Sequence, residues 1–445
     1  MKCIKPAAFL IFTFLVFTGI YAQSPHPQWT LQSNIYEVNV RQYSPEGNFK
    51  GFTKHLSRLK QMGVDILWFM PITPIGLKGR KMTERELGSY YSVKDYKAIN
   101  PEFGTMQDWK SLVNKAHDMG FKVITDWVPN HTAPDNGWIE RHTDFYVLDS
   151  AGKPMPPNPD WTDTRKLNYN NMEMQDSMIA AMKFWLTSSN IDGFRCDVAG
   201  EVPDSFWIRC IAELKTVKNV FMLAEADKPD LHEAGFDETY TWSVMSAMTD
   251  FYNKKLSLAG FDSVLNHNIA RFPANAQRLY FTANHDENSW NGTEYEKYGD
   301  AAKAFAVFTQ TFYQSLPLMY SGQEEPETKR IKFFVHDPIE WKTYALEPFY
   351  KILLTLRKNT PALASDASYK KVVTANDHAV FAYVREKQGS KIAVVLNLSD
   401  QPQNFTIKQT ELYGKVKNVF TLKTEILGST TVFSMKPWEY LVYKY

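Results

Sequence analysis

The sequence is short of cysteine and of excess charge, and each shortage excludes a class of protein. It contains 3 Cys among 445 residues, too few for the disulfide framework of a small secreted scaffold. Lys and Arg number 50 and Asp and Glu 49, which leaves a formal net charge of +1. A chain this balanced does not bind nucleic acid or an anionic membrane through bulk charge. Hydrophobic residues at 44% and charged residues at 22% also exclude a disordered or low-complexity chain.

Signatures of two other chemistries are missing as well. No glycine-rich phosphate loop follows the first predicted strand, and neither H-E-x-x-H nor H-x-H, spacings typical of metal sites, occurs. Aromatic residues, in contrast, are plentiful at 14%, with 12 Trp and 23 Tyr. Aromatic rings on a protein without net charge suit an uncharged, flat-faced ligand such as a sugar, although most rings serve the core.

The first 22 residues are typical of a secretory signal. Lys2 and Lys5 precede an apolar run from Ala7 to Ile20, and the small residue Ala22 stands before Gln23. The run of about 14 residues is shorter than the roughly 20 that cross a bilayer. An uncleaved anchor is the alternative interpretation. We therefore predict a signal peptide at 1–22, a secreted or periplasmic mature chain, and no membrane span in that chain.

The mature chain alternates between strand and helix patterns. Apolar runs predict eight strands, at 34–40, 65–70, 121–127, 191–196, 220–225, 237–242, 279–285 and 317–321. Helical spacing of apolar residues separates most of them, for example over 52–62 and 109–119, each followed by glycine. Eight such units in about 330 residues fit a (β/α)8 TIM barrel. A doubly wound open sheet is the alternative, which the missing phosphate loop disfavours.

Two segments depart from this alternation. The stretch at about 132–170, after the third strand, is rich in Pro, Asp and Asn, and we interpret it as a short inserted subdomain over the barrel. From about 362 to 445 the β-rich runs are separated by Asn, Asp, Gly and Ser, which predicts a C-terminal antiparallel β-sandwich. The predicted division is therefore a catalytic barrel over 23–361 and a sandwich over 362–445.

Polar side chains stand at the carboxyl ends of four predicted strands, where the active site of such a barrel lies. The third strand leads into Asp126 and His131, the fourth into Arg195 and Asp197, the fifth into Glu225 and the seventh into His285 and Asp286. A single acid at a strand end is usually a loop cap, and we assign Asp126 only an orienting role. Groups of this kind at four separate strand ends, however, indicate a common site.

Three of these carboxylates, Asp197, Glu225 and Asp286, match the needs of glycoside hydrolysis. In that reaction one carboxylic acid protonates the leaving oxygen, and one carboxylate attacks the anomeric carbon or activates water. Arg195 lies two residues before Asp197, so both side chains share one face of the strand and the cation would keep Asp197 ionised. Glu225 follows an apolar run, an environment that suits the acid. His131 and His285 can donate hydrogen bonds to sugar hydroxyls. A divalent metal held by these histidines and acids is the alternative, ranked lower because the local metal spacings are missing.

With these residues in place, the chain resembles the α-amylase family, glycoside hydrolase family 13. Residues 126–131 resemble its first motif, Asp-x-x-x-Asn-His, and 193–197 resemble its second, which ends in the nucleophile. Residues 223–226 match the third motif, with the acid, and 281–286 match the fourth. The similarity runs from about 34 to 330, and the predicted sandwich fits the family's C-terminal domain.

The resemblance implies a retaining double displacement on α-glucosidic bonds. Asp197 would form the glycosyl-enzyme, Glu225 would act as acid and then as base, and Asp286 would bind the distorted sugar. The substrate-binding residues would be Tyr91, His131, Arg195 and His285, with Tyr91 stacking under the sugar at the cleavage site. Retention implies that the Asp197 and Glu225 carboxyl groups lie about 5–5.5 Å apart.

The chain departs from the family at the positions that often serve calcium and the leaving group. The Lys-His pair after the nucleophile is replaced by Gly200 and Glu201, and Lys166 stands where an Asp calcium ligand is expected. Asp163 lies nearby as a substitute, and Asn130 alone does not make a site. We therefore predict no metal ligands and no firm cofactor, with any structural Ca²⁺ site degraded.

The leading hypothesis is hydrolysis of α-1,4 bonds in starch or maltodextrins, with an α-glucan as the partner. A transglycosylase or isomerase such as trehalose synthase, or an exo-acting α-glucosidase, would use the same three carboxylates. A non-catalytic glucan-binding protein on the same fold is a third hypothesis, which the presence of Asp197, Glu225 and Asp286 disfavours. The sequence alone does not decide among chain-length preferences or oligomeric states.

Overall fold

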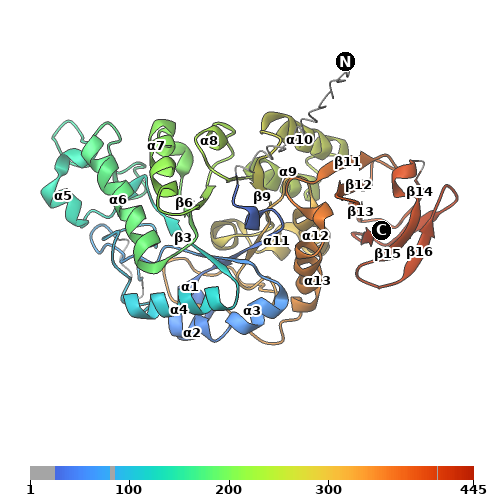
Figure 1. Ribbon diagram of the computed structural model, residues 1–445, viewed down its shortest axis with the longest axis horizontal. Helices are drawn as coiled ribbons and strands as arrows, with labels where there is room; N and C mark the ends of the chain where they lie inside the picture. Colours follow the sequence, from blue (N-terminus) through green and yellow to red (C-terminus); the bar gives the residue numbers. More distant parts are fainter. Residues whose placement is uncertain (1–25, 81–85, 408) are drawn as a thin grey trace, which may run out of the picture.

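The computed structural model describes residues 26–80, 86–407 and 409–445. The predicted signal at 1–22 lies outside these residues. Within them, a barrel of parallel strands precedes an antiparallel sheet, and the two lie side by side (Figure 1). In this described part of the chain, no helix combines the length and the apolar character needed to cross a membrane.

The barrel sheet has the strand order β10-β1-β2-β3-β6-β7-β8-β9, and its neighbouring strands are parallel. Its strands are β1 Ile35–Val38, β2 Ile66–Phe69, β3 Lys122–Trp127, β6 Gly193–Cys196, β7 Phe221–Ala224, β8 Glu238–Tyr240, β9 Gln277–Leu279 and β10 Leu318–Tyr320. Backbone hydrogen bonds from Leu316 N to Arg278 O and from Leu318 N to Tyr280 O, both 3.0 Å long, join β9 to β10. The sheet is therefore a nearly closed barrel, as predicted, and not an open doubly wound sheet.

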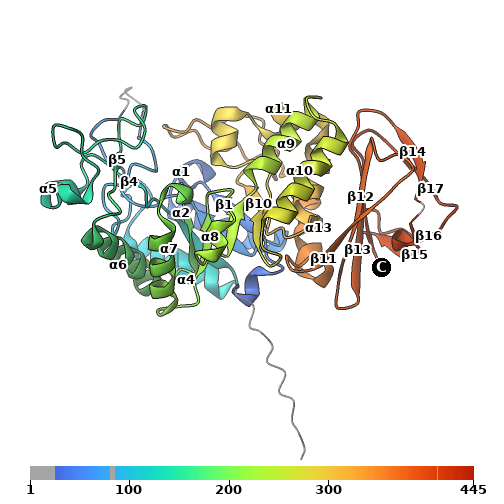
Figure 2. The ribbon, with the colours of Figure 1, turned by 90° about the horizontal axis from the view of Figure 1, so that it is seen from above.

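Helices follow most of the strands and surround the barrel (Figures 1 and 2). They are α1 Val40–Tyr43, α2 Phe49–Thr53, α3 Leu56–Met62, α4 Met106–Asp118, α5 Gly137–Arg141, α6 Met172–Ser189, α7 Asp204–Lys215, α8 Asp230–Glu233, α9 Trp242–Tyr252, α10 Leu258–Arg271, α11 Glu294–Tyr298, α12 Ala302–Thr311 and α13 Glu347–Lys358. Gly63 ends α3 with a φ of 104°, and Gly120 follows α4 with a φ of 77°. Both glycines adopt the left-handed conformation that a helix end favours.

Strand residues alternate between two hydrophobic cores. Ile66 and Trp68 on β2 belong to one buried cluster, whereas Leu67 and Phe69 belong to the other. The same alternation on β7 places Phe221 and Leu223 in the first cluster and Met222 and Ala224 in the second. Because side chains alternate across a strand, residues that share the phase of Trp68 point toward the barrel interior. This phase continues past the strand ends to the predicted catalytic residues.

Two predicted elements differ from the structure. The predicted strand at 279–285 is wrong in its placement, because β9 ends at Leu279. The apolar run continues to Ala283, and the Tyr280 carbonyl still accepts from Leu318, but the chain then leaves the sheet and turns at Asp286. The predicted helix at 52–62 is divided into α2 and α3, with a break at Lys54 and His55.

The segment between β3 and α6 carries short elements of its own. These are β4 His131–Thr132 and β5 Arg165–Lys166, which pair antiparallel, and α5. Both views place α5 at the end of the molecule opposite the C-terminal sheet (Figures 1 and 2). That these elements form a subdomain of their own stays a prediction, as do the exact boundaries between domains.

The C-terminal part is antiparallel, as predicted. A six-stranded sheet has the order β11-β12-β13-β18-β15-β16, and β14 pairs with β17. Its strands are β11 Ser368–Val372, β12 Val380–Lys387, β13 Ser390–Asn397, β14 Gln403–Thr406, β15 Gly414–Asn418, β16 Thr424–Leu427, β17 Val432–Met435 and β18 Tyr440–Lys444. Phe381 and Tyr383 on β12 join the barrel's hydrophobic cluster, whereas Val380 and Val384 join a separate cluster with Phe405 and Phe433. The large sheet thus packs against the barrel on one face and against the small β14–β17 sheet on the other.

Candidate active site

The predicted catalytic residues follow directly from the alternation of the barrel strands. Asp126 on β3 has the interior phase of Ile124, and Glu225 has that of Leu223. Arg195 is the third residue of β6, and Asp197 follows the end of that strand. These side chains therefore point inward at the carboxyl-terminal rim of the barrel, where parallel strands present their functional groups.

Arg195 is the centre of this group. Its Nη1 lies 3.0 Å from Asp126 Oδ1 and 3.0 Å from Asp197 Oδ1, and its Nη2 lies 2.9 Å from Glu225 Oε1. Its Nε donates to the Tyr240 hydroxyl at 3.2 Å. The guanidinium is fully buried, whereas the Asp197 and Glu225 side chains each keep 12% of their surface exposed. One fixed cation therefore holds both carboxylates at the edge of solvent, where a substrate can reach them.

The residue after Asp197 positions Glu225. Val198 has a φ of 38° and a ψ of 42°, a left-handed conformation that is rare for a β-branched residue. In this conformation its backbone N–H donates to Glu225 Oε2 at 2.7 Å. Glu225 is thus held through one oxygen by Arg195 and through the other by the Val198 backbone. Such strain at a residue between two functional groups indicates that the geometry is required there.

Burial dominates the ionisation of this group. It raises the pKa of Asp126 to about 6, although Arg195 acts in the opposite direction. Burial and the Glu225 carboxylate raise the pKa of Asp197 well above its ordinary value, and Arg195 offsets this only in part. Arg195 therefore acts on Asp197 in the expected direction, against burial and the neighbouring carboxylates. Carboxylates held close together disfavour each other's charged form, which favours a proton within the group, as acid catalysis needs.

His285 and Asp286 form the second half of the site. His285 Nε2 lies 3.3 Å from Asp286 Oδ2 and 2.8 Å from the Tyr91 hydroxyl. Burial alone would lower the pKa of His285, but Asp286 and Glu37 raise it well above its ordinary value. Burial acts to raise the pKa of Asp286, yet the His285 cation lowers it below its ordinary value. With 37% of its side chain exposed, Asp286 is an ionised carboxylate open to a ligand.

Glu37 is the functional residue that the sequence reasoning missed. It is fully buried on β1, and its Oε1 lies 2.5 Å from His285 Nδ1, which fixes the orientation of the imidazole. The signal was present: an acid at the interior phase of a buried apolar strand, two residues after Ile35. An acid in such a position requires a buried partner.

Tyr91 links the two halves of the site. Its hydroxyl donates to Asp126 Oδ2 at 3.1 Å, and its ring stacks on His285 with centroids 5.5 Å apart and planes 22° apart. Trp68 Nε1 also donates to Asp126 Oδ2, at 3.2 Å. Asp126 therefore orients its neighbours, as we expected of it.

His131 is buried on β4 with 2% of its surface exposed. Burial lowers its pKa to about 4, so the ring is neutral at neutral pH. Its ring centroid lies 5.5 Å from that of Trp161, a residue that is 39% exposed. A neutral imidazole can donate one hydrogen bond and accept another, as a sugar-binding residue requires.

The described residues offer no cluster of three carboxylate, imidazole or thiol ligands for calcium. Within the described ranges, no three His, Cys, Asp or Glu side chains are arranged to hold a metal ion. The Gly200 carbonyl accepts a hydrogen bond from Lys228 Nζ at 2.7 Å.

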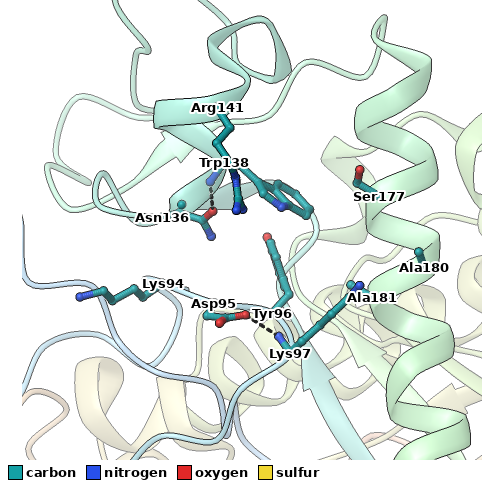
Figure 3. Close-up of a pocket in the computed structure, with 11 residues that line it drawn as sticks. Lys94, Asp95, Tyr96, Lys97, Asn136, Trp138, Arg141, Ser177, Ala180 and Ala181 are labelled. Carbon is teal, nitrogen blue, oxygen red and sulfur yellow. Dashed lines mark hydrogen bonds between the residues drawn. The ribbon is translucent and has the colours of Figure 1, made fainter.

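A cavity of about 320 Å³ lies apart from these residues (Figure 3). It is lined by Lys94, Asp95, Tyr96, Lys97, Asn136, Gly137, Trp138, Arg141, Ser177, Ala180 and Ala181. In Figure 3 the rings of Tyr96 and Trp138 lie next to each other in its wall, with centroids 5.1 Å apart. The Tyr96 hydroxyl donates to the backbone carbonyls of Val128 and His131, at 2.7 and 3.0 Å. The cavity therefore borders the segment that carries His131, and no predicted catalytic residue lines it.

Comparison with known families agrees with this geometry. The model of the α-amylase catalytic domain matches residues 16–378. The chain belongs to the α-amylase family. The model of the maltogenic amylase C-terminal domain matches residues 371–442, so the C-terminal sheet also has a counterpart among these glycoside hydrolases.

Individual relatives of this α-amylase family member are distant in sequence and close in structure. The α-amylase MalA of Haloarcula japonica is 26% identical over 406 residues, which cover 86% of this chain but 58% of MalA. A crystal structure of an α-amylase from Lactobacillus plantarum is 28% identical, with a TM-score of 0.84 over 95% of this chain and 100% of that one. The noncanonic maltogenic α-amylase AmyB from Thermotoga neapolitana is also 28% identical, with a TM-score of 0.80 over 93% and 96% of the two chains.

Proposed function

We propose that this protein is a retaining glycosidase that cleaves α-1,4-glucosidic bonds of starch-derived maltodextrins. The observation that carries the proposal is the contact of one buried guanidinium, Arg195, with both Asp197 and Glu225. Two carboxyl groups held side by side in this way can act on opposite sides of one bond, one as nucleophile and one as acid. The names of the relatives, α-amylase and maltogenic α-amylase, support an α-glucan as the substrate.

In the first step, the Glu225 carboxyl group donates its proton to the glycosidic oxygen while an Asp197 oxygen attacks the anomeric carbon. The C–O bond to the leaving sugar breaks, that sugar departs as an alcohol, and an ester links the glycosyl group to Asp197. In the second step, the Glu225 carboxylate accepts a proton from water, whose oxygen attacks the same carbon and displaces Asp197. The Asp197 carboxylate and the proton on Glu225 are restored, and the two inversions give net retention.

The remaining residues act on charge and position. Positive charge develops on the sugar ring in the transition state, and the ionised Asp286 carboxylate stabilises it electrostatically. The neutral His131 donates a hydrogen bond to a hydroxyl of the same ring, and Tyr91 offers its aromatic face. The His285 cation, whose Nε2 faces Tyr91 and Asp286, takes part in sugar binding from beside these two residues. Arg195 stabilises the charged form of whichever carboxylate is ionised at each step.

The predicted signal sequence supports a location outside the cytoplasm. We infer that the mature chain acts as a secreted or periplasmic enzyme, where large maltodextrins are available as substrates. Measuring the N-terminal residue of the exported protein tests this. A first residue at Gln23 supports cleavage, and an intact Met1 contradicts it.

The function is tested by incubating the mature chain with maltoheptaose and following products and anomers by NMR. We expect early release of α-anomeric maltose or longer oligosaccharides. Early glucose alone would indicate an exo-acting α-glucosidase, and chains longer than the substrate would indicate that transfer dominates. A β-anomeric first product would contradict Asp197 as the nucleophile. Repeating the assay with a chelator tests for calcium, and we expect the rate to be unchanged.

Asp197→Asn is the decisive variant. We expect turnover to fall about 10⁴-fold while glucan binding persists, because the amide keeps the shape but cannot attack. Asp118→Asn, at an exposed position at the end of α4, is the matched control and should keep full activity. Unchanged turnover in Asp197→Asn would contradict Asp197 as the nucleophile and with it the proposed double displacement.

A further inference from the structure

One buried ion pair lies next to the catalytic residues and takes no part in the reaction steps. Lys297 Nζ lies 2.8 Å from Glu287 Oε2, and the two side chains are only 5% and 6% exposed. Glu287 is the residue after Asp286. Taking two charges out of water is unfavourable, and their attraction offsets this loss only when the geometry is good. A buried pair at this position therefore requires a reason other than stability.

Glu287 begins an unusual turn of the backbone. The segment Glu287–Asn291 is π-helical, Asp286 is its N-cap residue, and Gly292 ends it with a φ of 127°. Such turns are rare in proteins and frequent at functional sites. One side of the turn carries Trp290, which keeps 53% of its surface exposed although its ring lies 5.5 Å from that of Phe333. Apolar burial is therefore incomplete on that side, and polar contacts on the buried side must fix the shape of the turn.

Glu287 is the centre of these polar contacts. Its Oε1 accepts from Asn291 Nδ2 at 2.8 Å, which links the two ends of the turn. Its backbone carbonyl accepts from Gly292 N at 2.9 Å. Its Oε2 accepts from Lys297 Nζ. The first residue of the turn is thus bonded to its last residue, to the residue that ends it and to a cation outside it, so a movement of Glu287 would also move the adjacent Asp286.

Lys297 reaches Glu287 from a helix that is itself anchored to the barrel. It lies on α11, which begins at Glu294. Glu294 Oε2 accepts from Thr282 Oγ1 at 3.0 Å and from Gln323 Nε2 at 2.5 Å. Thr282 follows β9 and Gln323 follows β10, so these bonds fix α11 to two barrel strands. The ammonium group therefore has a defined position, from which it can hold the Glu287 carboxylate in place.

We propose that Lys297 is a positioning residue for Asp286: through Glu287 it fixes the π-helical turn and so holds the Asp286 carboxylate beside His285. Asp286 Oδ2 lies 3.3 Å from His285 Nε2 while 37% of the Asp286 side chain is exposed, so the direction set by its backbone matters. Electrostatic stabilisation of a transition state depends on exact placement, and a small displacement lowers the rate. The inference rests on the proposed function, in which Asp286 stabilises the positive charge that develops on the sugar.

Replacing both partners of the pair tests this role without leaving a charge buried. In Glu287→Gln combined with Lys297→Met the amide keeps the shape of the carboxylate and no unpaired charge remains, so the variant should fold. We expect kcat on maltoheptaose to fall at least about tenfold and KM to change less than about threefold, because Asp286 acts mainly in the transition state. The matched control, Glu213→Gln with Lys183→Met, removes another pair 2.8 Å apart, between α6 and α7, and should keep kcat. An unchanged kcat in the first variant would overturn the proposal.

NMR titration of the His285 imidazole, assigned with His285→Gln, reports the position of Asp286 without any substrate. Asp286 and Glu37 raise the pKa of His285, so an Asp286 carboxylate that has moved away lowers its titration midpoint. We expect this shift to lower pH in Glu287→Gln combined with Lys297→Met, which removes one charge of each sign, and no shift in the control pair.

The two measurements separate the positioning role from the proposed function. A His285 midpoint equal to that of the wild type would overturn the positioning role even if kcat fell, because Asp286 would then not have moved. A lowered midpoint would support the role even if the wild-type chain hydrolysed no maltodextrin, which would contradict only the proposed function.

Discussion

At the scale of single residues, Val198 shows how the backbone serves the site. A β-branched residue in the left-handed region costs about 1–3 kcal/mol, and here it turns the Val198 N–H toward Glu225. The neighbouring catalytic residue thus receives a fixed hydrogen bond that a relaxed chain would not provide. Arg195 has the corresponding role for side chains, since one guanidinium orients three carboxylates.

We expect Val198→Gly to be more stable than Val198→Ala by about 1 kcal/mol, because glycine alone adopts a positive φ without steric cost. This order is the reverse of that at an ordinary position, where the flexible glycine is the less stable of the two. Both variants keep the N–H that Glu225 accepts, so kcat should stay within about threefold of the wild type. Urea unfolding checks the prediction, and an alanine variant at least as stable as the glycine variant would show that the backbone at 198 is not strained.

His131 makes a prediction about acid stability. Burial lowers its pKa to about 4, whereas an unfolded histidine titrates near 6.5. Between these values the unfolded chain binds the proton and the folded chain does not, so stability falls as the pH drops from about 6.5 to 4. The full difference corresponds to about 3 kcal/mol at this residue. Urea unfolding of the wild type and of His131→Asn at pH 7.5 and pH 4 isolates the contribution of His131 to this loss of stability. The variant should lose less stability on acidification, and parallel losses would exclude His131 as a cause.

At the scale of elements, the barrel strands could be predicted because they are buried on both faces and appear as continuous apolar runs. Their last residues, from Asp126 to Glu225, could be predicted for the same reason, since the rim of a parallel barrel gathers whatever follows each run. The placement of β9 could not, because the apolar run to Ala283 does not show where the chain leaves the ladder. The role of Glu37 and the exposure of Trp290 were also missed. Both depend on partners far along the chain, His285 for the first and Phe333 for the second.

At the scale of the whole molecule, the barrel and the C-terminal sheet share one hydrophobic core. Phe381 and Tyr383 on β12 contact Phe312, just after α12, with ring centroids 6.4 and 5.6 Å apart. Arg385 on the same strand is fully buried at this junction. It donates to the carbonyls of Thr311 and Phe312 from the barrel side, at 3.0 and 2.5 Å. Arg385 Nε also donates to the carbonyl of Ser368, at the start of β11. The barrel and the C-terminal sheet are therefore joined by apolar packing and by a buried cation that bonds to backbone carbonyls of both.

From this junction we predict that the barrel and the C-terminal sheet unfold together. We also predict that Arg385 is needed to keep them joined. Burial lowers the pKa of Arg385 to about 10, so the guanidinium stays charged at neutral pH and needs all of its carbonyl partners. Arg385→Met would leave those carbonyls buried without a donor, and we expect a loss of at least about 3 kcal/mol. Arg330→Met, which removes an arginine whose side chain is 48% exposed, should cost less than about 1 kcal/mol. Denaturant unfolding followed by tryptophan fluorescence and by far-UV circular dichroism should give one coincident transition in the wild type. Two separate transitions, with Arg385→Met shifting only the weaker one, would mean that the C-terminal sheet folds independently of the barrel.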